Sequence, residues 1–147
     1  MPTTCSLIRL FLTLVAPTCA SLGAEVNVAH KDEVGRRGEE CAAQYLAGDG
    51  YRIIARNWRC AEGEIDVIVE RDGEVAFVEV KTRSSTRFGH PFEAITVVKL
   101  ARMRRLAAAW CEQAEVWPPR IRIDAIAVIT GTGTGSEPIV EHLKGVF

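Results

Sequence analysis

Two consecutive apolar segments that carry acidic residues at interior positions constrain the fold of this chain more than any other feature. The segments are Glu64–Glu70 and Glu74–Thr82, and Arg71-Asp72-Gly73 separates them. Their β-branched residues predict two strands, and the Asp-Gly pair between them predicts a tight hairpin turn. Such a hairpin would bring Asp66 close to Glu79 across the ladder.

The charges within these segments need an explanation, because a lone charge buried in an apolar strand is costly. Side chains alternate along a strand, so Glu79 and Lys81 point to the same face. Two explanations remain open: structural ion pairs between Asp66, Glu79 and Lys81 or nearby arginines, or a divalent-cation site with a companion base. Glu64 and the helical Glu39 would add further acids, and crowded carboxylates repel unless a cation joins them. Carboxylate ligands suit a hard cation such as Mg²⁺ or Mn²⁺ and argue against zinc.

Length, charge and cysteine usage set the broad class. A chain of 147 residues is long enough for one domain with its own core. Its formal net charge of −1 gives no overall attraction to nucleic acid or to a membrane, so any such binding must come from local clusters. The five scattered cysteines form no C-x-x-C pair and no zinc spacing, which indicates reduced thiols in a cytoplasmic protein.

The N-terminal segment allows two interpretations. A short apolar run, Leu10–Ala16, follows Arg9 and precedes small residues, a pattern typical of a secretory signal and too short to span a membrane. The alternative, which we favour, is that residues 1–30 are an extension outside the fold and that residues 31–147 form the functional domain. The first interpretation predicts secretion, and the second predicts a cytoplasmic location.

The rest of the sequence predicts one mixed α/β domain in the order α-β-β-β-α-β. Helical periodicity predicts helices over residues 32–48 and 96–112, and alternation or continuous apolar runs predict strands over 51–58, 64–70, 74–82 and 120–129. The last of these strands is expected to be buried on both faces, and residues 138–143 are expected to add a short edge strand. The expected apolar stripe of the second helix is Val97, Leu100, Met103 or Arg104, Ala107 and Cys111.

The acidic segments also resemble a known motif. Asp66, twelve further residues, and then Glu79-Val80-Lys81 resemble the PD-(D/E)xK motif of restriction-endonuclease-like nucleases, although Ile65 stands where that motif has a proline. A longer string resembles the YraN-like family of small bacterial proteins: Gly35-Arg-Arg-Gly-Glu-Glu-Cys-Ala42, Tyr45-Leu46, Gly50-Tyr51, Arg56-Asn-Trp-Arg59, Gly63-Glu-Ile-Asp66, Phe77-Val-Glu-Val-Lys-Thr-Arg83, Gly89, Lys99 and Glu141-His142. The resemblance covers residues 34–147. It implies a restriction-endonuclease-like mixed sheet similar to that of archaeal Holliday-junction resolvases.

The resemblance implies roles for individual residues. Asp66 and Glu79 would be metal ligands, with the Val80 carbonyl as a third. Glu39 would complete the site from the first helix. Lys81 would orient or help to deprotonate the attacking water and offset charge in the transition state.

Residues around the motif would contact nucleic acid. Basic side chains suited to gripping phosphates are Arg83, Arg87, Lys99, Arg102 and Arg105. Glu64 either lies next to the metal ligands without binding the metal itself, or pairs with Arg56 or Arg59. Phe88 and Phe92 either pack within their loop or stack on unpaired bases.

These expectations favour a Mg²⁺- or Mn²⁺-dependent endonuclease that hydrolyses phosphodiester bonds in structured or branched DNA, without membrane contact. The alternative is a non-catalytic nucleic-acid-binding module of the same fold. A secreted protein of another role is a third hypothesis, and it depends on the N-terminal segment. Resolvases of this fold act as dimers on two-fold symmetric junctions, so the analogy also predicts a homodimer.

Overall fold

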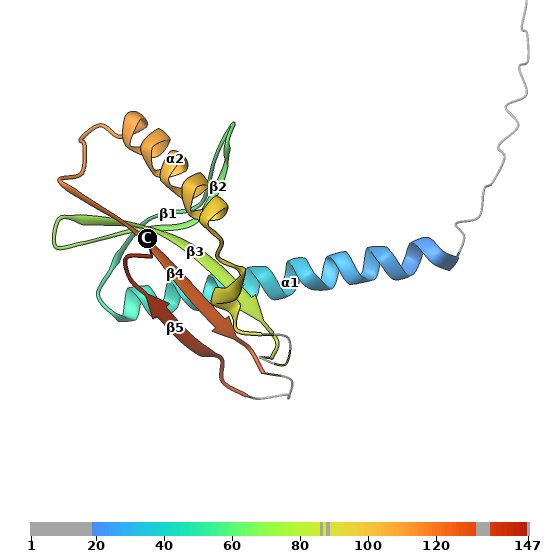
Figure 1. Ribbon diagram of the computed structural model, residues 1–147. Helices are drawn as coiled ribbons and strands as arrows, with labels where there is room; N and C mark the ends of the chain where they lie inside the picture. The colour runs from blue at the N-terminus through green and yellow to red at the C-terminus, as the bar shows by residue number, and fades with distance from the viewer. Residues whose placement is uncertain (1–18, 86, 88, 132–135, 147) are drawn as a thin grey trace, which may run out of the picture.

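A computed structural model describes residues 19–85, 87, 89–131 and 136–146 (Figure 1). Its elements are α1 (Cys19–Gly48), β1 (Arg52–Cys60), β2 (Gly63–Arg71), β3 (Glu74–Arg83), η1 (Pro91–Ala94), α2 (Val97–Gln113), β4 (Arg120–Ile129) and β5 (Ile139–Leu143). The predicted order, with a short C-terminal strand, is confirmed. The 3₁₀ turn η1 lies in a stretch that the sequence indicated only as the end of a loop.

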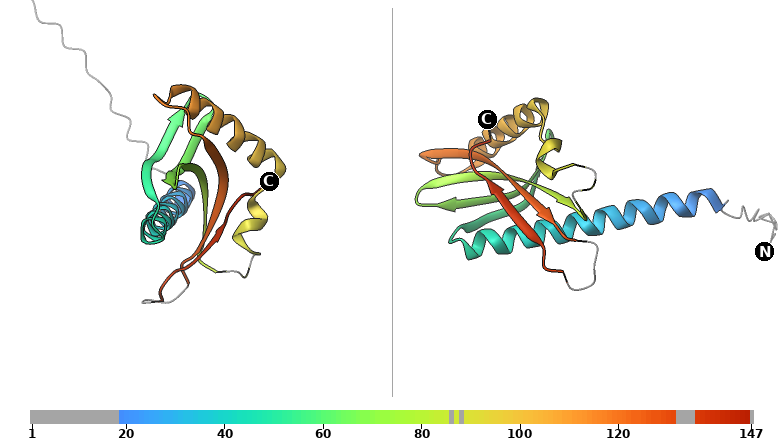
Figure 2. Two further views of the ribbon diagram at one scale, coloured as in Figure 1. Left: turned by 90° about the vertical axis from the view of Figure 1, so that its left-hand side faces the viewer. Right: turned by 60° about the horizontal axis from the view of Figure 1, so that its bottom comes forward.

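The five strands form one mixed sheet in the order β1-β2-β3-β4-β5. Neighbours are antiparallel except β3 and β4, which run parallel from Glu74↔Arg120 to Arg83↔Ile129. A parallel pair needs a crossover connection, and η1 and α2 supply it. Helix α1 covers one face of the sheet and α2 the other, so the fold has three layers (Figure 2).

Each face of the sheet has its own core. Ala42 and Leu46 of α1 pack on a valine-rich face that includes Val67 and Val78. The opposite face packs against α2 through the buried residues Ile68, Phe77, Met103, Leu106 and Ala107. Residues 123–128 of β4 are buried, which confirms the prediction of a strand covered on both faces.

Two expectations for the helices were wrong. Helix α1 begins at Cys19 rather than at residue 32, so helical structure runs well before the predicted start. Val97 does not belong to the buried stripe of α2, because it is the first residue of the helix and its side chain is 81% exposed. Leu106 lies on the buried face in its place.

The apolar run near the N-terminus lies in residues 1–18, outside the described residues, so both interpretations of that segment stay predictions. Within the described ranges, no helix combines the length and the apolar character needed to cross a membrane.

The feature of the sheet that positions the site is the separation of β2 from β3. The ladder between them ends at Val67↔Val78, whereas β2 stays paired with β1 as far as Gly63. The end of the β1–β2 hairpin therefore leaves the sheet and lies beside α2 (Figure 1). From Glu79 onward, β3 keeps its partner β4 on one edge and no longer pairs with β2 on the other.

Candidate active site

Asp66 occupies the point at which β2 leaves β3. Its Oδ2 atom accepts a hydrogen bond of 2.7 Å from the backbone N–H of Val80. The carboxylate thus takes the place of the strand carbonyl that a continuing ladder would supply. In an extended strand the N–H and C=O of one residue point to the same edge, so the Val80 carbonyl also faces the gap beside Asp66.

The environment of Asp66 disfavours its ionised form. Burial, followed by the neighbouring charge of Glu79, raises the pKa of Asp66 from 3.8 to about 7. The Val80 N–H and the Lys81 ammonium oppose this shift, and Glu39 adds a small further rise. The negative charges of Asp66 and Glu79 therefore repel each other in a partly buried place. A cation beside them would reduce this repulsion and lower the pKa of Asp66.

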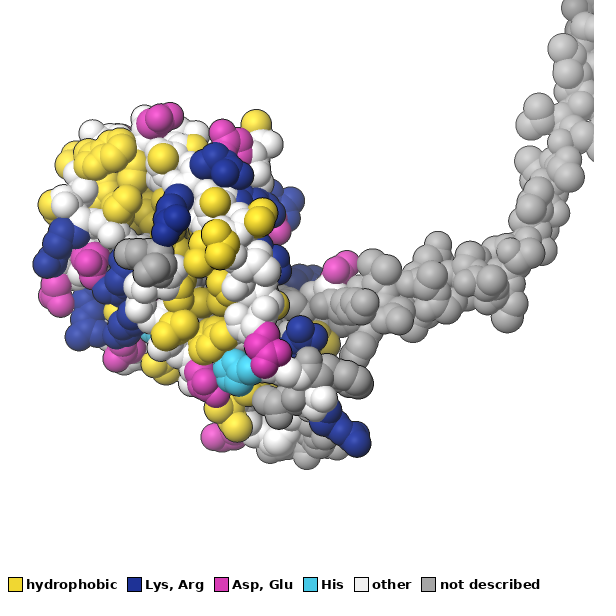
Figure 3. Space-filling view, viewed as in Figure 1, with side chains coloured by type: hydrophobic (Ala, Val, Ile, Leu, Met, Phe, Trp, Pro, Cys, Tyr) yellow, Lys and Arg dark blue, Asp and Glu magenta, His cyan; other side chains and the backbone are white. Residues whose placement is uncertain are grey.

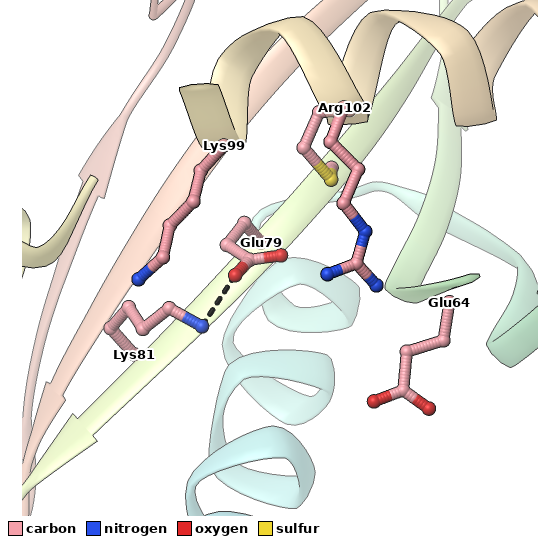
Figure 4. A pocket seen from close by; sticks show the side chains of 6 residues that line it. Glu64, Glu79, Lys81, Lys99 and Arg102 are labelled. Atoms are coloured by element: carbon pink, nitrogen blue, oxygen red, sulfur yellow. Dashed lines mark ion pairs between the residues drawn. The ribbon is translucent and has the colours of Figure 1, made fainter. Parts of the chain in front are cut away.

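Glu79 and Lys81 point to the same face of β3, as strand alternation predicted, and form an ion pair (Figure 4). Their side chains are 19% and 29% exposed, so the ion pair is partly buried but still accessible to solvent. The pair lies in a pocket of about 190 Å³ lined by Glu64, Glu79, Lys81, Lys99, Arg102 and Met103.

Helix α2 supplies the basic wall of this pocket. Lys99 and Arg102 extend from α2 toward the Glu79–Lys81 pair in Figure 4. Lys99 also donates from Nζ to the backbone carbonyl of Ala94, at 2.7 Å. The guanidinium of Arg102 lies against Gly63 at the end of the hairpin, where the glycine leaves room for it and adopts a φ of 143°.

Glu39 reaches the neighbourhood because α1 packs very closely on β3. A Cβ at Gly38 would lie 1.8 Å from Oγ1 of Thr82, so the helix backbone rests on the strand directly after Lys81. Glu39 follows on the helix, and its Oε2 accepts a hydrogen bond of 2.7 Å from Nδ2 of Asn57. Asn57 had no predicted role.

The structure brings together only part of the predicted phosphate-contact set. Lys99 and Arg102 line the pocket, whereas the exposed side chains of Arg83 and Arg87 do not. Arg105 instead lies 4.0 Å from Glu62 at the tip of the hairpin.

One interpretation of Glu64, a pair with Arg56 or Arg59, is confirmed for Arg59, and its support of the metal ligands stays a prediction. Glu64 pairs with Arg59 at 3.0 Å, and it also lines the pocket below Arg102. Phe92 is half-buried, with its ring centroid 5.0 Å from that of His90, which favours loop packing over base stacking. Phe88 lies outside the described residues.

The carboxylates of the site each have a partner of their own. Asp66 binds the Val80 N–H, Glu79 pairs with Lys81, and Glu39 binds Asn57. In the part of the chain that the structure describes, no three His, Cys, Asp or Glu side chains converge closely enough to hold a metal ion. The oxygen ligands available at the edge of β3 are thus two carboxylates and one backbone carbonyl.

A second polar cluster, which the sequence did not reveal, lies away from this pocket. Asp124 is fully buried and receives both a two-pronged hydrogen bond from Arg122, at 2.7 and 3.0 Å, and one from His142, at 2.8 Å. Burial alone would raise the pKa of Asp124, but His142, Arg122 and the Gly145 N–H together hold it below its ordinary value. The cluster ties β5 and the C-terminal residues to β4, and the charges of Arg122 and Asp124 within a strand of apolar residues were a signal of it in the sequence.

An exposed apolar surface also lies away from this pocket. Figure 3 shows hydrophobic side chains gathered over the C-terminal end of α2 and the loop that follows, where Val116 and Trp117 are 80% and 61% exposed. A shallow pocket beside this loop is bordered by Arg52, Glu70 and Glu115 but contains no paired acid and lysine facing one another. The chemistry-bearing residues thus concentrate at the edge of β3.

Comparison with known proteins identifies close relatives. Residues 38–128 match a family described as "Uncharacterised protein family UPF0102". A UPF0102 protein of Arthrobacter sp. (strain FB24) is 54% identical over 116 residues, which cover 79% of this chain and 97% of the relative. The protein Lxx14785 of Leifsonia xyli is 49% identical over 119 residues (81% and 99%), and a UPF0102 protein of Nocardia farcinica is 45% identical over 129 residues (87% and 99%).

Proposed function

Because the chain belongs to the UPF0102 family, the YraN-like family, whose description names no reaction, we propose its function from the site: metal-dependent hydrolysis of phosphodiester bonds in DNA. The observation that carries the proposal is the placement of Asp66, Glu79 and Lys81 at the edge of β3 that β2 has left. Structured or branched DNA is the proposed substrate class, by analogy with the resolvases that the sequence resembles.

The residues at this edge fit a divalent cation. Burial and the charge of Glu79 raise the pKa of Asp66 to about 7, and a cation would counter both causes. Asp66, Glu79 and the Val80 carbonyl would hold Mg²⁺ or Mn²⁺, since all three offer oxygen atoms. When bound, the ion would supply Lewis-acid polarisation of a phosphoryl oxygen and a lowered pKa for water.

The basic residues then divide into two roles. Lys81, held in place by Glu79, would orient the attacking water and offset the negative charge of the transition state. Lys99 and Arg102 would bind phosphate oxygens that do not react, which fixes the backbone across the pocket without reading its sequence.

A cleavage screen tests the proposal. The purified chain is incubated with Mg²⁺ or Mn²⁺ and with linear, flapped and four-way DNA, and with RNA of the same sequences. We expect cleavage of a branched DNA, and a loss on the order of 10³-fold in Asp66→Ala, Glu79→Ala and Lys81→Ala with DNA binding retained. Glu70→Gln, at the far end of β2, is the matched control and should cleave normally. Failure of the wild type on every substrate would refute the proposal.

One observation favours a second candidate, a nucleic-acid-binding module without turnover. Each carboxylate of the site already has a protein partner, and no three acidic side chains converge among the described residues. Calorimetric titration with Mn²⁺ separates the two candidates. Tight binding that Asp66→Asn abolishes supports the nuclease, whereas DNA binding without any Mn²⁺ binding supports the module.

A further inference from the structure

Asn57 has a backbone conformation that most residues avoid. Its φ is 48°, in the left-handed region, although it lies inside strand β1. Asparagine visits this region more readily than other non-glycine residues, because its short amide can bond locally. The flanking pairs Arg56↔Val67 and Trp58↔Ile65 place Asn57 opposite Asp66. The irregularity therefore occurs at the level of the proposed metal ligand.

The side chain of Asn57 points out of the strand to helix α1. Its Nδ2 donates to Oε2 of Glu39 over 2.7 Å, and it is the one hydrogen-bond donor to that carboxylate among the described residues. A glutamate on a helix surface otherwise samples several rotamers, so a donor fixed on a strand removes that freedom. With Oε2 taken, Oε1 remains for a ligand at the centre. Glu39 follows Gly38, whose backbone lies against Thr82 directly after Lys81, so the helix brings this carboxylate to the same part of β3.

Attachment of the hairpin to α1 does not require Asn57. One residue earlier on β1, Arg56 donates from a terminal nitrogen to Oε2 of Glu40, at 2.7 Å. Glu40 is the neighbour of Glu39 on the helix, and it also binds Gln44. The two contacts join the same elements, but only Asn57 lies opposite Asp66, whereas Arg56 pairs with Val67. Asn57 has an unfavourable backbone conformation, although Arg56 next to it already joins β1 to α1. This indicates that Asn57 has a role other than joining the two elements.

We propose that Asn57 is a positioning residue that turns the Glu39 carboxylate toward the Asp66–Glu79 centre. The inference rests on the proposed function, since it gives Glu39 the task of completing the cation site. Asn57 touches neither substrate nor cation in this scheme and acts through Glu39 alone. Loss of the Asn57 amide would let the Glu39 side chain sample other rotamers and would leave the fold unchanged.

The experiment compares Asn57→Gly with Arg56→Ala in the full chain. Glycine accepts the left-handed φ without strain, so this variant removes the amide and spares the backbone. Calorimetry measures the affinity for Mn²⁺, and cleavage of the substrate found in the screen measures kcat and KM. We expect Asn57→Gly to weaken Mn²⁺ binding at least about tenfold and to lower kcat, as is usual when a ligand loses its supporting hydrogen bond. Arg56→Ala should change neither.

A double-mutant cycle with Glu39→Gln distinguishes positioning from a general structural effect. If Asn57 acts through Glu39, Asn57→Gly adds no further loss once Glu39 is replaced. The inference is overturned if Asn57→Gly binds Mn²⁺ as the wild type does, if its loss is equal on both backgrounds, or if Arg56→Ala loses as much. A wild type that binds no Mn²⁺ and cleaves nothing overturns the proposed function itself, and this inference with it.

Discussion

Replacing Asp66 with asparagine should stabilise the protein in metal-free buffer, even though it removes a proposed metal ligand. Asparagine has the same shape, and its Oδ1 can still accept the 2.7 Å hydrogen bond from Val80. What the substitution removes is a partly buried negative charge beside Glu79. The protein would thus become more stable and less active through a single change.

The size of the gain follows from the pKa of Asp66. Between the ordinary value of 3.8 and the raised value of about 7 lie about three pH units, each equivalent to about 1.4 kcal/mol. The upper limit is therefore about 4 kcal/mol. Asp66 is half-buried rather than fully enclosed, so water screens part of this energy, and we expect about 2 kcal/mol. For a chain of 147 residues, this corresponds to a rise of roughly 6 °C in Tm.

The gain should depend on pH in one direction. Because the folded state raises the pKa of Asp66, it binds more protons than the unfolded state between pH 3.8 and about 7. Across this window the wild type loses stability as the pH rises, whereas the asparagine variant does not lose this contribution. The difference in the free energy of unfolding should be small near pH 4 and complete above pH 7.

Urea denaturation followed by circular dichroism, with a chelator present, measures these free energies at about pH 4, 6 and 8. Asp72→Asn, in the exposed turn of the same hairpin, serves as the matched control and should shift stability by less than about 0.5 kcal/mol. Added Mn²⁺ should stabilise the wild type and leave Asp66→Asn unchanged. An equal gain at pH 4 and pH 8, or a loss at pH 8, would refute the reasoning.

Three further predictions concern other parts of the fold. Gly38→Ala forces a Cβ to 1.8 Å from a hydroxyl oxygen and should cost about 1–3 kcal/mol in thermal denaturation. Gly35→Ala, on the same helix with open space, should be neutral or stabilise by up to about 1 kcal/mol, and equal losses would contradict the close packing. Arg102→Ala should weaken DNA binding and reduce the slope of the logarithm of the binding constant against the logarithm of the salt concentration by about 1. Arg120→Ala, at the start of β4, should do neither. Asp124→Ala should lower the free energy of unfolding by about 3–5 kcal/mol, because it removes the buried acceptor of Arg122 and of His142 and leaves Glu74 as the acid partner of Arg122, and a loss below about 1 kcal/mol would show that the cluster is not structural.

Local patterns explain what the sequence could predict. The turn Arg71-Asp72-Gly73 and the alternation around it predicted the pairing of β2 with β3, because a short turn fixes the register of a hairpin. The same alternation placed Glu79 and Lys81 on one face. The predicted bounds of β4 agree with those of the structure, since Trp117-Pro-Pro119 and Gly131 interrupt the apolar pattern at the two ends.

The features that were missed depend on contacts between distant segments. Gly38 gave no sign that it would rest on Thr82, because a small residue in a helix shows its reason only when the facing strand is known. The buried partners of Asp124 come from β5 and from a residue two places away on β4, and the charge pattern alone did not show that they would meet. Asn57 carried a weak signal, since asparagine is unfavourable inside a strand and tolerates a left-handed φ.

The departure of β2 from β3 connects the stability of the fold with the proposed chemistry. When two strands part, the freed strand is left with an N–H and a C=O that need partners. Asp66 satisfies the N–H of Val80, and this places a carboxylate where burial raises its pKa. The Val80 carbonyl, which faces the same gap, needs a donor or a cation, and an ionised carboxylate, which only accepts hydrogen bonds, cannot serve it. A divalent cation would satisfy that carbonyl and both carboxylates at once, so the backbone arrangement that destabilises the metal-free site is the one that would favour the proposed cation.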